Sequence, residues 1–157
     1  MKKSILLLFV LGISLQLKAQ YPSHNISLYS KWFDSTVVEE PYYHIKYNSI
    51  WGWKNTIQNK EYAILGATIG TYFIDVSNPS NPIQCDFVAG RRGACIWREF
   101  KTYSHYAYLV SDDSPPNSFQ IVDMSYLPDS VHVVGELVLT LAPRTARTNP
   151  DFARSSN

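Results

Sequence analysis

The stretch "GTYFIDVSNPSNP" at residues 70–82 decides the fold, because it has the features of a β-strand that ends in a turn. A second copy of the same phrase, "NSFQIVDMSYLPDS", follows at residues 117–130. In each copy an apolar run leads to Asp and Ser, and then to proline, which cannot continue a hydrogen-bonded strand. A phrase that occurs twice predicts a chain built from repeated structural units.

The segments around the two phrases repeat in the same order. Short β-rich runs are separated by clusters of Gly, Pro, Asn, Asp and Ser. The runs expected to form strands are residues 49–54, 61–68, 71–77, 83–90, 95–103, 105–111, 118–125 and 130–136. They fall into two four-stranded units, residues 47–90 and 95–136. Four strands in a repeat of about 45 residues predict an all-β, β-propeller-like fold.

Matching residues in the two units define the repeat positions, and these are Trp51, Tyr62, Asp75, Trp97, Tyr106 and Asp123. Each Asp ends its strand, where a carboxylate can accept hydrogen bonds from N–H groups of the turn. Metal binding or catalysis is the alternative role for these two carboxylates. The strands that precede them are apolar throughout, which predicts that both of their faces are covered. Closed propellers usually have about four to eight blades, so two units predict an incomplete ring.

The N-terminus has the pattern of a secretory signal peptide. Lys2 and Lys3 precede the apolar run "SILLLFVLGISLQL", and Ala19 supplies the small residue at the cleavage position. The predicted signal peptide is residues 1–19, and the exported chain would begin at Gln20. The apolar run is shorter than the ~20 residues of a membrane span, so no span is expected after cleavage. Residues 20–46 then form a lead-in segment.

The composition changes at the C-terminus. Residues 137–157 are expected to form an atypical basic tail, in which Arg144, Arg147 and Arg154 occur without Lys. A flexible basic tail is one interpretation. A truncated or frame-shifted reading is the other, and the abrupt loss of aromatic residues favours it.

Bulk composition excludes some classes of protein. The chain is 45% hydrophobic and 14% aromatic, which supports a packed core rather than disorder. Its formal net charge of +1 offers no field that would attract nucleic acid, so no such partner is expected. Export permits disulfides, and Cys85 and Cys95 flank the turn-like segment "DFVAGRRGA". They are either bridged or two buried thiols.

No motif assigns a reaction. The sequence has neither a G-x-S-x-G elbow nor an H-E-x-x-H zinc motif, and we assign no catalytic residue, metal site or cofactor. The loop "DDSPPN" at residues 112–117 could hold Ca²⁺, but it lacks the spacing of a calcium loop, and a solvated insertion is the simpler interpretation. Trp51, Trp53 and Trp97 could stack on a sugar, although aromatic residues of inner strands more often belong to the core.

The phrases "EYAILGATIGTYFIDVSNPSNP", "WREFKTYSHYAYLVSDD" and "FQIVDMSYLP" together resemble the LVIVD-repeat proteins. More closely, they resemble the exported bacterial group called choice-of-anchor B. This resemblance implies a propeller-like repeat protein, outside the cell or on the outer surface of a Gram-negative bacterium. Relatives continue for several more blades, so the chain is expected to be an N-terminal fragment. The family has no established reaction.

These observations predict a secreted or cell-surface protein with a non-catalytic binding or scaffold role. The expected partner is a protein or a glycan. The open edges of the blades could also lead the chain to associate with itself. The alternative function is an extracellular propeller-type enzyme that acts on glycans or peptides.

Overall fold

The computed structural model describes residues 25–111 and 117–139. The predicted signal peptide, most of the predicted tail and nearly all of the candidate calcium loop lie outside these residues. The strands of the described residues are, in chain order, β1 (Tyr47–Asn55), β2 (Lys60–Ala67), β3 (Gly70–Asp75), β4 (Ile83–Ala89), β5 (Arg98–Tyr103), β6 (Tyr106–Ser111), β7 (Asn117–Asp123) and β8 (His132–Leu139). Each predicted run overlaps one of them, so the all-β prediction is confirmed.

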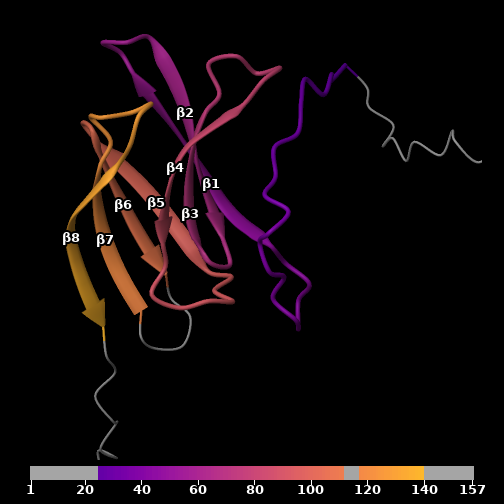
Figure 1. The fold of residues 1–157 in the computed structure, drawn as a ribbon, viewed down its shortest axis with the longest axis vertical. Coiled ribbons are helices and arrows are strands. Elements are labelled where there is room, and N and C mark those ends of the chain that lie inside the picture. Colours follow the sequence, from indigo (N-terminus) through magenta and orange to yellow (C-terminus); the bar gives the residue numbers. More distant parts are fainter. Residues whose placement is uncertain (1–24, 112–116, 140–157) are drawn as a thin grey trace, which may run out of the picture.

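The strands form two four-stranded antiparallel sheets, ordered β1-β2-β3-β4 and β5-β6-β7-β8. Figure 1 shows the two sheets stacked on one another. The repeated phrase supplies the third strand of each sheet, as the sequence predicts. In the part of the chain that the structure describes, the two sheets form no closed ring.

The pairing registers place the Tyr and Asp repeat positions opposite each other in both sheets. Tyr62 pairs with Asp75 in the first sheet, and Tyr106 pairs with Asp123 in the second. The position of Trp51 is a correction. In β1, Trp51 lies two residues before the residue that pairs with Tyr62. In β5, the equivalent position, two residues before the residue that pairs with Tyr106, is occupied by Lys101 and not by Trp97. Trp97 instead precedes β5, where it is 56% exposed.

A hydrophobic core fills the space between the sheets. Side chains alternate along each strand, so one face of β2 and β3 meets one face of β6 and β7. The first sheet contributes Ile64 and Phe73, and the second contributes Phe100 and Leu109. All four side chains are buried. Burial of apolar surface here is the main term that holds the two units together.

Hydrogen bonds fix how one sheet lies on the other. The backbone N–H of Val131 donates to Asp86 Oδ2 at 2.7 Å, and buried Arg98 Nε donates to the carbonyl of Ala67 at 2.8 Å. Further bonds of this kind join Trp51 Nε1 to Thr102 Oγ1 and Gln120 Nε2 to the carbonyl of Ala89. Directional bonds between apolar surfaces select one arrangement, which apolar contact alone does not.

The lead-in segment covers the other face of the first sheet. Val37 is buried there beside Tyr72, and Trp32 packs against the same cluster. Tyr72 Oη donates to Asp34 Oδ2 at 2.7 Å, which anchors the segment. The prediction that strands are covered on both faces is therefore confirmed for the first sheet. For the second sheet, the described residues cover only the face toward the first.

Candidate functional site

The two repeat-position carboxylates act as turn caps. Asp75 Oδ1 accepts the backbone N–H of Ser77 at 2.9 Å, and Asp123 Oδ1 accepts that of Ser125 at 2.8 Å. This matches the structural role predicted from the sequence. The described residues contain no cluster of three or more His, Cys, Asp or Glu side chains that could hold a metal ion.

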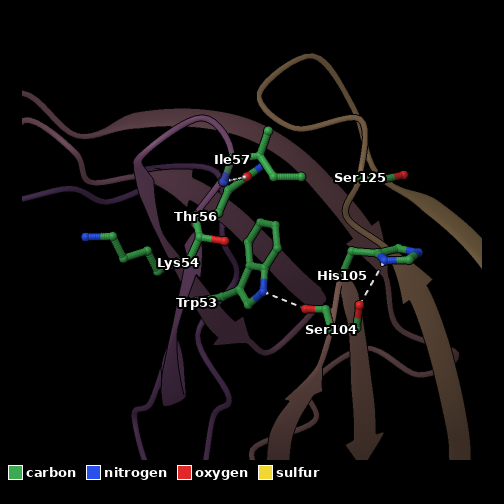
Figure 2. A pocket seen from close by; sticks show the side chains of 8 residues that line it. Trp53, Lys54, Thr56, Ile57, Ser104, His105 and Ser125 are labelled. Carbon is green, nitrogen blue, oxygen red and sulfur yellow. Dashed lines mark hydrogen bonds between the residues drawn. The ribbon is translucent and has the colours of Figure 1, made fainter.

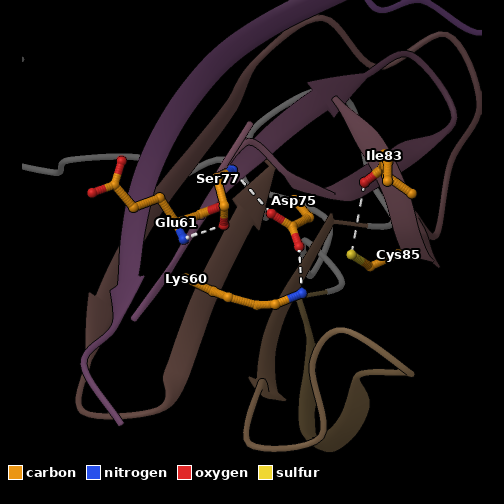
Figure 3. A network of polar contacts seen from close by, with 6 residues as sticks. All are labelled: Lys60, Glu61, Asp75, Ser77, Ile83 and Cys85. Atoms are coloured by element: carbon orange, nitrogen blue, oxygen red, sulfur yellow. Dashed lines mark hydrogen bonds and ion pairs between the residues drawn. The ribbon is translucent and has the colours of Figure 1, made fainter. Parts of the chain in front are cut away.

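Asp75 belongs to a wider polar network at the end of the first sheet (Figure 3). Lys60 Nζ lies 2.8 Å from Asp75 Oδ2, and Ser77 Oγ accepts the backbone N–H of Glu61 at 2.9 Å. Burial raises the pKa of Asp75, but the hydrogen bonds from Lys60 and Ser77 outweigh it and hold the pKa below its ordinary value. The network therefore stabilises the ionised carboxylate.

We expect Asp75→Asn to make the free energy of unfolding less dependent on pH. The folded state lowers the pKa of the Asp75 carboxyl. The stabilisation that this carboxylate gives the folded protein is therefore complete above the unfolded-state pKa and is lost as the pH falls through the folded-state pKa. At neutral pH the variant should lose roughly 1 kcal/mol, since it loses a partly exposed ion pair and keeps an acceptor for Ser77. Urea unfolding between neutral and strongly acidic pH measures the difference, which should vanish in acid. Exposed Asp129→Asn is the control.

Neither cysteine forms a disulfide in the structure. Cys95 is buried, and its backbone N–H donates to the carbonyl of Thr68 at 3.0 Å. Cys85 is half-buried in β4, and burial raises the pKa of its thiol. A raised pKa lowers the thiolate fraction and with it the reactivity of the sulfur.

A hollow of about 280 Å³ opens at one end of both sheets (Figure 2). Its walls come from the end of β1 and the β1–β2 turn, from the β5–β6 turn, and from the residues after β7. The lining residues are Trp53, Lys54, Asn55, Thr56, Ile57, Ser104, His105 and Ser125. Both repeat units are therefore needed to form this hollow.

Trp53 links the two sheets at the hollow. Its Nε1 donates to the carbonyl of Ser104 at 2.9 Å, across the two sheets, and its ring packs on Tyr62 with centroids 5.6 Å apart. Asn55 Oδ1 accepts the backbone N–H of Ile57 at 3.1 Å, which shapes the turn. Ile57 is 96% exposed, so the rim has an apolar side chain in contact with solvent.

Of the three tryptophans weighed as a sugar platform, Trp51 and Trp53 lie two residues apart on the same face of β1, and Trp97 lies apart from them. Trp51 packs against the core between the sheets, and Trp97 lines a separate hollow beside Arg98 and Val110. Only Trp53 reaches the hollow between the turns. Its place before the polar segment "NTIQNK" was the signal in the sequence, because a Trp at a strand end borders a loop.

The polar groups of the hollow are mainly neutral. None of its lining residues is Asp or Glu, so the lining lacks the carboxylate pair of glycoside hydrolysis. Ser104 Oγ lies 3.1 Å from His105 Nδ1, and His105 Nε2 lies 4.0 Å from Asp123 Oδ1. The second distance is too long for a hydrogen bond. What remains is an aromatic edge surrounded by hydroxyl and amide groups, with one charged group, the ammonium of Lys54, which lies 3.2 Å from Glu61 Oε1.

No protein-family model, no curated protein and no solved structure matches the chain. The resemblance to LVIVD-repeat proteins therefore stays a prediction. The described residues also include no helix with the length and hydrophobicity that crossing a bilayer requires.

Proposed function

We propose that the chain is an exported, propeller-like β-repeat protein whose role is to bind a ligand without transforming it. The observation that carries this proposal is the hollow shared by the turns of the two stacked units. Cross-sheet bonds from Trp53, Asp86 and Arg98 hold these turns on a fixed scaffold. Loops on a rigid repeat scaffold are well suited to recognition.

The lining favours a neutral, hydroxyl-rich ligand with an apolar side, such as a glycan. An aromatic residue can pack against the apolar side of a sugar ring, while hydroxyl and amide groups bind its hydroxyls. Trp53 and Ile57 supply the apolar contact, and Asn55, Thr56 and Ser104 supply neutral donors and acceptors. A peptide that presents an apolar side chain and backbone amides is the second ligand class.

Isothermal titration calorimetry of residues 20–157 with neutral oligosaccharides and with peptides tests the binding. We expect Trp53→Ala to weaken binding at least tenfold, which is about 1.4 kcal/mol. Ile57→Glu should weaken it too, and because Ile57 is 96% exposed this change leaves the core intact. Trp97→Ala is the matched control and should bind normally. Binding that survives both changes in the hollow would contradict the proposal.

The second candidate is an extracellular hydrolase, and Ser104, His105 and Asp123 are the observation that favours it. In a working triad the base bonds both the nucleophile and a carboxylate that orients it. Here Asp123 instead caps the turn at Ser125, and it is 4.0 Å from the imidazole. We therefore expect no turnover of ester or peptide substrates and no labelling of Ser104 by a fluorophosphonate probe. Labelling that Ser104→Ala abolishes would establish the hydrolase.

A further inference from the structure

The two sheets meet through unlike faces. Tyr62 of β2 points toward the second sheet, whereas its register equivalent in β6, Tyr106, points away from the first. Conversely, Ala107 of β6 points toward the first sheet, and its equivalent, Ala63, lies under the lead-in. The interface within the chain is therefore heterologous, because one type of sheet face packs on the other type.

The outward side of the second sheet, here called the open face, has the type that receives a sheet. Its residues are Tyr106, Tyr108, Phe119, Ile121 and Leu137. By register, Leu137 corresponds to Val88 of the first sheet. Val88 is 7% exposed because it belongs to the core between the sheets, whereas Leu137 is 58% exposed. Among the described residues, no sheet covers the open face.

The lead-in occupies the other type of face. The side of the first sheet beneath it, here called the covered face, includes Ala63, Leu65, Tyr72 and Ile74. The register equivalents of Ala63, Leu65 and Ile74 are Ala107, Leu109 and Val122, with which the second sheet packs on the first. Alanine and leucine are unchanged between the two faces, and isoleucine replaces valine. The covered face therefore has the apolar pattern that already packs on a face of the open type.

The lead-in is held on the covered face by few contacts. Val37 is the fully buried side chain of residues 25–46, and Tyr72 Oη donates to Asp34 Oδ2 at 2.7 Å. The β-bridge of these residues, from Glu40 to Ile45, lies within the segment, so no hydrogen-bonded ladder attaches it to the sheet. Most of its other large apolar side chains are exposed. A sheet that buries more apolar surface can therefore displace it.

Charge neither selects this partner nor opposes it. The charged residues of the open face are Glu99, Lys101 and Asp123. The Lys101 ammonium lies 4.0 Å from the centroid of the Trp51 ring in the same chain. Asp75 is the register equivalent of Asp123, and it lies on the face of the first sheet that receives the second. A carboxylate at this position is therefore compatible with a packed sheet.

We propose that the covered face is a docking site for the open face of a second copy, and that the lead-in blocks this contact until it is displaced. The contact between copies would repeat the one between the two sheets. It would lack the cross-sheet bonds of Asp86 and Trp51, because Gly135 and Lys101 occupy the equivalent positions, so it is weaker than the contact within the chain. This proposal goes beyond ligand binding and does not depend on the hollow, which lies at the ends of the sheets.

A mixing experiment with residues 20–157 tests the contact. One partner carries Val37→Asp, which puts a charge beneath the lead-in and releases it, and Leu137→Glu, which blocks the open face of that copy. The other partner is the unaltered chain, which has an open face but a blocked docking site. In sedimentation equilibrium we expect each partner alone to be monomeric, and the mixture to form a one-to-one complex that grows no further.

Val38→Asp combined with Leu137→Glu is the matched control. Val38 is next to Val37 but is 71% exposed, so the same chemical change leaves the lead-in in place. We expect its mixture with the unaltered chain to associate at least tenfold more weakly. Circular dichroism checks the fold of each variant. Tyr72→Phe, which removes the bond to Asp34 and keeps the apolar ring, replaces Val37→Asp if that variant does not fold.

Three results would overturn this proposal. Folded partners that stay monomeric when mixed would show that the two faces do not fit. Association of the double variant with itself would show that the covered face binds its own type. Association of the unaltered chain with itself would show that the lead-in does not block the contact. Ligand titration of the same samples reads the hollow separately, so this proposal and the proposed function can fail independently.

Discussion

Replacement of Phe73 by alanine should lower the free energy of unfolding by about 3–5 kcal/mol. Phe73 is fully buried in β3, in the core between the two sheets. The variant loses the transfer free energy of the ring and leaves a cavity that faces Phe100 and Leu109 from the other sheet. Domains of this size are stable by only roughly 5–15 kcal/mol, so the change removes much of the total. Urea unfolding followed by circular dichroism measures the loss.

Phe33→Ala is the matched control for this prediction. Phe33 lies in the lead-in segment and is 68% exposed, so the same chemical change should alter stability by no more than about 0.5 kcal/mol. If the Phe73 variant were as stable as this control, the two sheets would not share a core in solution. Their stacking, on which the hollow depends, would then be wrong.

Gly66→Ala should cost about 2–3 kcal/mol, because the site has no room for a methyl group. A Cβ at Gly66 would lie 2.4 Å from the backbone oxygen of Asn48 and 3.1 Å from the ring of Phe100. The first contact is with backbone, in a strand whose register shifts beside Asn48. Relief of the clash requires β1 to move away from β2, and this disturbs the strand that carries Trp53 to the hollow.

Gly52→Ala separates this clash from the general effect of alanine in a strand. Gly52 lies in the same pair of strands, and its added Cβ would meet nothing within 4 Å. We expect a change within about 0.5 kcal/mol, since alanine also restricts the unfolded chain. Equal losses in the two variants, measured by urea unfolding, would show that β1 does not approach β2 as closely as the structure has it.

The sequence by itself determined the strands and the repeat, because these rest on local chemistry. Apolar runs ended by Asp, Ser and Pro specify strands that stop in a turn, and the same signals recur one unit later. The caps at Asp75 and Asp123 follow from the same reasoning, since each bond reaches only two residues along the chain. No partner from elsewhere in the fold is needed for them.

Only the tertiary structure decided which faces of the two sheets pack together and which turns lie side by side at the ends of the strands. A strand that is apolar on both sides does not show which side meets the next sheet, so the packing of the second sheet and the cover by the lead-in were not predictable. The register that puts Lys101 in place of Trp97 depends on pairing, which spacing along the chain does not fix. The hollow joins Trp53 to Ser104, residues 51 apart in sequence, and such a contact exists only once two complete sheets have stacked.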